Sequence, residues 1–190
     1  MTTSDNGDRA ATAPAPAQAP AAGRAPDRLP EQPPRIDLGA LDSGVHRAMN
    51  QLDRAVHKVV DPVLHELVKI RASQINRCAF CIDMHTKDAL AAGETVERIV
   101  QLPAWRESRH FYSAKEVAAL DLTEAITVPT EGSVPDDVVE RAAKELEPAE
   151  LTGVIAAINL INMWNRLSLT ARMAPGHYEP GMFPFPVRGD

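Results

Sequence analysis

Large aromatic side chains are scarce in this chain: Phe, Trp and Tyr make up only 4% of its 190 residues. The hydrophobic share of 44% is still ordinary for a globular protein, so Leu, Ile, Val and Ala must build the core. No apolar run approaches the roughly 20 residues that a membrane-spanning helix needs, so we expect no membrane partner. The length fits one domain with a core of its own.

Runs of lysine and arginine are also lacking, and the formal net charge is −6. Nucleic-acid binding needs a basic patch, so we expect no nucleic-acid partner. The N-terminus lacks the pattern of a signal peptide, because Asp5 and Asp8 stand where a basic segment belongs and prolines break the Ala-rich stretch. We therefore expect a cytoplasmic protein that works where thiols are kept reduced.

Cysteine is the third scarce residue type, since the chain has only Cys78 and Cys81. A structural disulfide that closes so short a loop would remove little chain entropy, and structural disulfides are rare in the cytosol. The pair therefore indicates redox chemistry or metal binding, and not a covalent scaffold.

The composition divides the chain into three parts. Residues 1–35 are mostly Ala, Pro, Gly and charged residues, and they cannot bury enough apolar surface to offset their ordering entropy, so we expect a disordered tail. Residues 36–175 are expected to form one folded domain. Residues 176–190 are rich in proline and glycine, which predicts a loop without regular structure.

Every strong periodic signal in the folded part is helical. Asp61 before Pro62 is an N-cap pattern, and Ser113 with Glu116 forms a capping-box pattern. The first expected helix carries one apolar stripe, made of Leu41, Val45, Met49, Leu52 and Val56. The expected helices cover residues 41–56, 62–76, 78–93, 94–101, 114–128, 136–146 and 148–167. No strand is expected, so we predict an all-α, single-domain bundle of about six to eight helices.

The candidate site lies where the second and third helices meet. Residues three and four apart share one face of a helix, so Cys78, Cys81 and His85 are expected to lie together. Cys78 falls at or near the helix N-terminus, where unpaired N–H groups and the helix dipole stabilise a thiolate. An imidazole ordinarily titrates near neutrality, so His85 can exchange a proton with Cys81 across one turn.

Glu66 on the preceding helix is the carboxylate expected to face these residues, because the short connection packs the two helices together. It would orient His85 or relay a proton through water. Its neighbour His65 points about 100° away around the helix, so we expect His65 on the surface.

Glu66 followed by Cys78, Cys81 and His85 within a helical pair resembles the core of the alkyl hydroperoxidase D-like branch of the carboxymuconolactone decarboxylase superfamily. Segments 102–108, 120–125 and 162–166 also look like segments of that branch, and the resemblance covers roughly residues 36–175. It implies an AhpD-like all-α fold that assembles into homo-oligomers, a trimer or a hexamer. The founding hydroperoxidase has a second histidine beside its C-terminal cysteine, where this chain has Phe80, so a relay through two histidines is not carried over.

The resemblance further implies a thiol-dependent peroxidase or disulfide oxidoreductase, comparable to a peroxiredoxin-like alkyl hydroperoxide reductase. Its catalytic residues would be Cys78, Cys81, His85 and Glu66, and the cysteine pair would need no bound cofactor or metal. The partners would be a hydroperoxide and a reducing dithiol protein or small thiol. The helix dipole favours Cys78 as the attacking thiolate, whereas a base within reach favours Cys81; we favour Cys81.

Other interpretations stay open at this point. The cysteines could be small buried hydrophobic residues, or they could bind zinc together with His85 and with Glu66 or water. The chain could also be a carboxymuconolactone decarboxylase-type lyase, or a non-redox metal-binding module on the same scaffold. Four polar residues of the last helix either bond near the site or between subunits, or form a seam facing solvent: Asn159, Asn162, Asn165 and Arg166.

Overall fold

The computed structural model describes residues 29–38, 44–129 and 132–182. The chain divides into two units, Met1–Pro30 and Glu31–Asp190, and every described helix belongs to the second unit. Three predictions lie partly outside the described residues: the disordered tail up to residue 28, the placement of Leu41, and the last part of the C-terminal loop, 183–190.

Within the described residues there are seven α-helices and no strand, which confirms the predicted all-α fold. They are α1 (Gly44–Val56), α2 (Pro62–Asn76), α3 (Ala79–Ala91), α4 (Val96–Gln101), α5 (Ala114–Thr127), α6 (Asp136–Glu145) and α7 (Pro148–Ala171). Short 3-10 turns at Leu102–Ala104 and Arg109–Phe111 connect α4 to α5. None of the described helices is long and apolar enough to cross a membrane.

The helices begin where their capping residues predict. The Asp61 side chain accepts hydrogen bonds from the backbone N–H groups of Val63 and Leu64, at 3.0 and 3.2 Å. Ser113 and Glu116 form the complete capping box at the start of α5, with both reciprocal bonds present. These side chains satisfy N–H groups that the helices themselves leave without partners.

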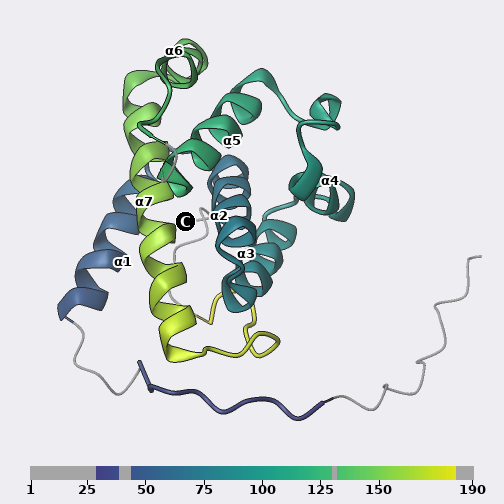
Figure 1. The fold of residues 1–190 in the computed structure, drawn as a ribbon, viewed down its shortest axis with the longest axis vertical. Coiled ribbons are helices and arrows are strands. Elements are labelled where there is room, and N and C mark those ends of the chain that lie inside the picture. Colours follow the sequence, from purple (N-terminus) through teal and green to yellow (C-terminus); the bar gives the residue numbers. More distant parts are fainter. Residues whose placement is uncertain (1–28, 39–43, 130–131, 183–190) are drawn as a thin grey trace, which may run out of the picture. The chain divides into compact units, whose positions relative to one another are not determined.

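Helix α2 is the central element of the bundle, and it packs against α3, α5 and α7 (Figure 1). Every residue from Leu64 to Ile70 is buried, because neighbouring helices cover α2 on all sides. Helix α1 lies beside α7, and its Asp53 reaches His65 and Lys69 of α2. A polar residue on α2 therefore has to find its partner inside the protein.

Only part of the apolar stripe predicted on α1 is buried. Met49 and Val56 pack inward, whereas Val45 and Leu52 are 66% and 45% exposed. Helix α1 instead turns a charged residue inward, since Asp53 is only 2% exposed. The helix is rotated so that this carboxylate meets polar groups of α2, an arrangement that an apolar pattern cannot predict.

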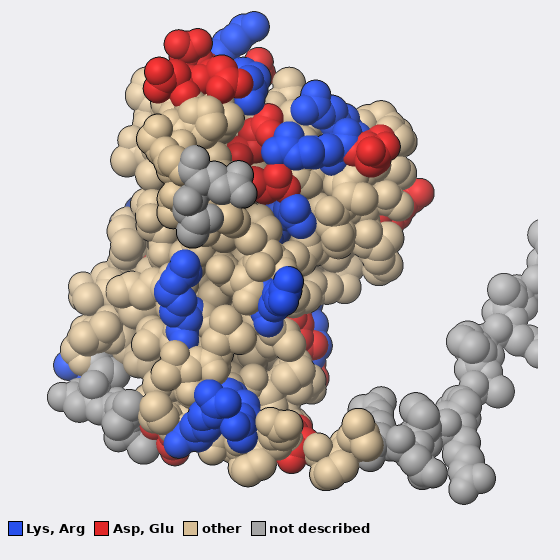
Figure 2. Space-filling model, in the orientation of Figure 1, with Lys and Arg blue, Asp and Glu red and all other residues tan. Residues whose placement is uncertain are grey.

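Basic and acidic side chains are mixed on the face that Figure 2 shows. Near α5 and α6, for example, Arg106 and Arg141 both pair with Asp121, at 2.7 and 3.6 Å. The expectation of no nucleic-acid partner, made from composition, stays a prediction.

Candidate active site

The two cysteines stand at the start of α3. Helix α2 ends at Asn76, and the single residue Arg77 then takes a left-handed conformation, with φ 58°. Cys78 follows as the N-cap of α3, so it lies at the helix N-terminus, as predicted. Its backbone N–H donates to the Ser73 carbonyl at 3.0 Å. Cys81 lies one turn into the helix. Both thiols are free and both side chains are only 1% exposed.

The surroundings of the two thiols shift their pKa values in opposite directions. The Cys81 sulfur accepts hydrogen bonds from the Cys78 thiol and the Ser168 hydroxyl, and it lies near the positive charge that His85 can carry. These groups lower the pKa of Cys81 to about 6, although burial opposes the shift. The same Cys78–Cys81 hydrogen bond, together with burial, raises the pKa of Cys78. The site therefore favours a thiolate on Cys81 at neutral pH.

Glu66 and His85 meet inside the protein. Nδ1 of His85 lies 2.8 Å from Oε2 of Glu66, and the two residues are only 4% and 7% exposed. Burial alone would raise the pKa of Glu66, but the charge of Lys69 and the charge and hydrogen bond of His85 hold it at about 2. A carboxylate at this distance fixes the orientation of the imidazole ring.

Helix α7 supplies polar partners from the opposite side. Asn165 is fully buried, donates to Oγ of Ser73 at 3.0 Å, and adds a hydrogen bond to the Cys81 sulfur. Ser168, one turn later, is 4% exposed. The polar residues predicted on α7 therefore do not share one environment. Asn165 lies at the cysteines, whereas Asn159 is exposed and its side chain donates to the Ile155 carbonyl. Ser168 is not predictable from the sequence, because a lone serine on an apolar helix carries no distinguishing signal.

A cavity of about 550 Å³ opens beside Cys81. Its lining includes Cys81, His85 and Glu66, whereas Cys78 does not reach it. Most of the remaining wall is apolar or aromatic, and it includes Phe80, Met84, Trp164, Met173 and Tyr178. A molecule in the cavity would therefore meet the Cys81 sulfur, with Cys78 behind it.

The C-terminal segment closes part of this cavity. The Tyr178 hydroxyl donates to Oδ1 of Asp88 on α3 at 2.7 Å, and Tyr178 is only 2% exposed. Lys87 binds the Tyr178 carbonyl at 2.8 Å. Residues 172–182, the described part of this segment, contain no helix or strand, and Tyr178 anchors them to α3 through Asp88 and Lys87. No pattern in the sequence indicates that this segment lines the cavity.

The prediction that His65 lies on the surface is wrong. His65 is fully buried, with its ring nitrogens 3.7 Å from the Asp53 carboxylate and 3.8 Å from Glu66. His65 does point about 100° away from Glu66, but Asp53 of α1 and the His57 ring lie on that side of α2, so the His65 ring faces them and not solvent. Burial and the nearby charge of Lys69 lower the pKa of His65 well below its usual value.

Two groups of side chains within the described residues are close enough to share a metal ion. One is Asp53, His57 and His65; the other is Glu66, His85 and Asp88. Neither group includes a cysteine, so the zinc site considered for Cys78 and Cys81 does not correspond to either of them.

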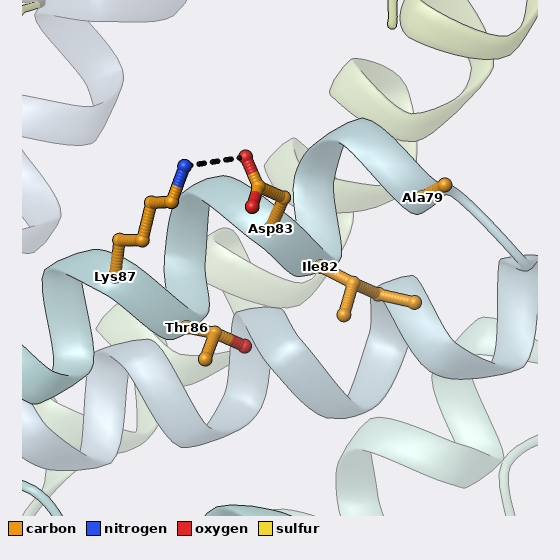
Figure 3. Close-up of a pocket in the computed structure, with 5 residues that line it drawn as sticks. All are labelled: Ala79, Ile82, Asp83, Thr86 and Lys87. Carbon is orange, nitrogen blue, oxygen red and sulfur yellow. Dashed lines mark hydrogen bonds and ion pairs between the residues drawn. The ribbon is translucent and has the colours of Figure 1, made fainter. Parts of the chain in front are cut away.

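The opposite face of α3 offers a second, open hollow (Figure 3). Its lining consists of Ala79, Ile82, Asp83, Thr86 and Lys87. Its only charged groups are Asp83 and Lys87, and they pair with each other at 3.0 Å. This face carries no thiol and no histidine, so the candidate site is the cavity at Cys81.

Comparison with known proteins places this architecture in a family. The model of the carboxymuconolactone decarboxylase family matches residues 44–125, which include Glu66, both cysteines and His85. YdfG, an uncharacterised protein of Bacillus subtilis, is 46% identical over 110 residues, which are 58% of this chain and 74% of that protein. The chain belongs to the carboxymuconolactone decarboxylase family. A second relative, uncharacterised YnjA of Escherichia coli, is 31% identical over 109 residues, which are 57% of this chain and 59% of YnjA.

Solved structures agree with this family assignment. A protein of unknown function from Agrobacterium tumefaciens, described as a candidate antioxidant defence protein AhpD, aligns with a TM-score of 0.72 and 32% identity. The alignment covers 76% of this chain and 99% of that protein. A peroxidase-related protein from Silicibacter aligns with a TM-score of 0.60 over 69% of this chain and 70% of its own; at 15% identity it shows the shared fold alone. The resemblance to the alkyl hydroperoxidase D-like branch is thus confirmed.

Proposed function

We propose that this family member is a thiol-dependent peroxidase in which Cys81 reacts with a hydroperoxide and Cys78 resolves the product. One observation carries the proposal: Cys81 faces the cavity with a pKa lowered to about 6, and Cys78 donates a hydrogen bond to it from behind. A low-pKa thiolate open to a small molecule, beside a second thiol, is the arrangement that redox-active cysteines require.

The first chemical step consumes the hydroperoxide. The Cys81 thiolate attacks the terminal oxygen of ROOH, so an S–O bond forms while the O–O bond breaks. The departing alkoxide takes a proton and leaves as the alcohol, and Cys81 becomes a sulfenic acid. His85, held by Glu66 at 2.8 Å, is the proton donor of this step.

The second step forms the disulfide. The Cys78 sulfur attacks the Cys81 sulfenic acid; an S–S bond forms, the S–O bond breaks, and the hydroxyl leaves as water with the proton of the Cys78 thiol. An external dithiol then donates two electrons and two protons, which restores both thiols. The sum is one hydroperoxide and one dithiol converted to an alcohol, water and an oxidised dithiol.

The protein also exposes apolar side chains that fit assembly with further copies of itself. Val45 and Leu52 on α1 are 66% and 45% exposed, and Met163 and Leu169 on α7 are 43% and 44% exposed. These side chains lie on two helices that pack side by side, and contiguous exposed apolar surface marks interaction sites. We infer a homo-oligomer, whose size is checked by light scattering during size-exclusion chromatography.

The decisive test of the activity is a thiol count on the purified protein before and after one equivalent of cumene hydroperoxide. The proposal expects two free thiols to become none, with the loss of two hydrogens in the intact mass and one equivalent of cumyl alcohol. If the thiols persist, the redox mechanism is wrong. Activity on a small carboxylated lactone that survives alkylation of both cysteines would support the lyase alternative instead.

A further inference from the structure

A second polar cluster lies between α1 and α2, apart from the cysteines. Asp53 lies on α1, His57 is the first residue after the end of α1, and His65 faces both from α2. The His57 N–H still donates to the Asp53 carbonyl at 3.0 Å, so the two side chains keep helical i, i+4 spacing and lie on the same side. The rings of His57 and His65 are nearly perpendicular, with their centroids 4.2 Å apart.

Several buried polar atoms of this cluster have no hydrogen-bond partner. They are both ring nitrogens of His65, which is fully buried, and Oδ2 of Asp53, which is 2% exposed. Buried polar atoms are nearly always satisfied in folded proteins. Three such atoms in one place indicate that the cluster holds a further group.

The spacing of the cluster fits a tetrahedral metal ion. Nε2 of His57 lies 3.4 Å from Oδ2 of Asp53, Nε2 of His65 lies 3.7 Å from Oδ1 of Asp53, and one ligand atom from each residue falls within 4.8 Å of the others. Zinc binds nitrogen and oxygen ligands at about 2.0–2.2 Å, which places neighbouring ligands of a tetrahedron about 3.3–3.6 Å apart. Small side-chain adjustments therefore bring all three onto one ion.

Lys69 sets the orientation of the carboxylate. Its Nζ lies 3.0 Å from Oδ1 of Asp53, so the ammonium holds one oxygen and leaves Oδ2 facing His57. Ligating carboxylates are usually held in this way by an outer partner. The carboxylate of Glu66 lies 3.8 Å from Lys69 and offsets part of the charge that the ammonium brings.

We propose that Asp53, His57 and His65 form a binding site for a divalent transition-metal ion of the zinc type. Two imidazoles and one carboxylate suit such ions, whereas magnesium and calcium prefer oxygen ligands. Asp53 and His57 also line the cavity that Cys81 faces, so the fourth position of the ion is directed toward that cavity. This site does not depend on the proposed peroxidase activity.

The test is zinc binding by the full chain after treatment with a chelator. Titration with zinc chloride should give one equivalent bound, with magnesium chloride giving none under the same conditions. His65→Gln and His57→Gln should each weaken zinc binding at least tenfold, while His46→Gln, a histidine of α1 outside the cluster, should leave it unchanged. His57 is partly exposed, so its variant keeps the test valid if His65→Gln does not fold.

Cobalt substitution distinguishes this site from the thiols and from the second group. The proposal expects a cobalt spectrum without thiolate-to-metal charge transfer, and expects His85→Gln to bind zinc as the unaltered protein does. It is overturned if no zinc binds, if the charge-transfer band places the metal on Cys78 or Cys81, or if His85→Gln abolishes binding while His57→Gln and His65→Gln do not.

Discussion

Ser168 tests most sharply how the protein makes Cys81 acidic. The Ser168 hydroxyl donates to the Cys81 sulfur, and this bond strengthens when the sulfur carries a charge. A hydrogen bond to a charged group is worth about 1.5–3 kcal/mol, and one pKa unit corresponds to about 1.4 kcal/mol. Ser168→Ala should therefore raise the pKa of Cys81 by about 1–2 units.

The direction of the effect on reactivity follows from the sign of this shift. A thiol with a pKa of about 6 is about 90% thiolate at pH 7, whereas a pKa of about 7.5 leaves about 25%. Ser168→Ala should thus slow the reaction with iodoacetamide at pH 7 about two- to tenfold, and about fourfold for a shift of about 1.5 units. The two proteins should react alike above about pH 9, where both are thiolates.

The assay is the alkylation rate of Cys81 as a function of pH, followed by mass spectrometry of the peptide that carries it. Thr170→Ala is the matched control, because it removes an exposed hydroxyl two residues further along α7. A Ser168→Ala profile that coincides with that of the unaltered protein would refute the assignment of Ser168 as a donor to the thiolate.

The remaining predictions concern other contacts of the structure. His85→Gln should lower the rate of cumene hydroperoxide reduction about 10²- to 10⁴-fold, measured in single turnover against His110→Gln as the control; an unchanged rate would rule out His85 as the proton donor. Glu124→Ala should lower the free energy of unfolding by about 2–4 kcal/mol in urea titrations, because Glu124 accepts from Arg71, Arg106 and the buried Trp105 ring; a loss below about 0.5 kcal/mol, the ordinary size for a surface substitution, would contradict this. Tyr178→Phe should lower the free energy of unfolding by about 1–3 kcal/mol and speed proteolysis after residue 171, because it removes the hydrogen bond to Asp88. Unchanged proteolysis would show that this hydrogen bond does not hold the C-terminal segment on α3.

The sequence predicted the all-α fold and the approach of Glu66 to His85 because both depend on local patterns. Caps such as Asp61 and the pair Ser113–Glu116 mark helix ends through side chains a few residues away. The spacing of Cys78, Cys81 and His85 likewise follows from the helical repeat. The short link through Arg77 was enough to predict that Glu66 would face His85.

The sequence did not reveal residues whose burial or position at the site depends on which helices pack together. His65 was expected at the surface because the position of α1 is not encoded in the periodicity of α2. Asp53 is buried for the same reason, on a helix whose apolar pattern indicated another inward face. Ser168 and Tyr178 reach the site from 87 and 97 residues beyond Cys81, by tertiary packing alone.

The central claim is that Cys81 is the thiol that reacts with the hydroperoxide. It is tested most directly by treating Cys78→Ser and Cys81→Ser with one equivalent of cumene hydroperoxide and then with dimedone, which traps sulfenic acids, before mass spectrometry. We predict one dimedone adduct on Cys81 in Cys78→Ser and none in Cys81→Ser. An adduct on Cys78 in Cys81→Ser, with none on Cys81 in Cys78→Ser, would contradict the claim.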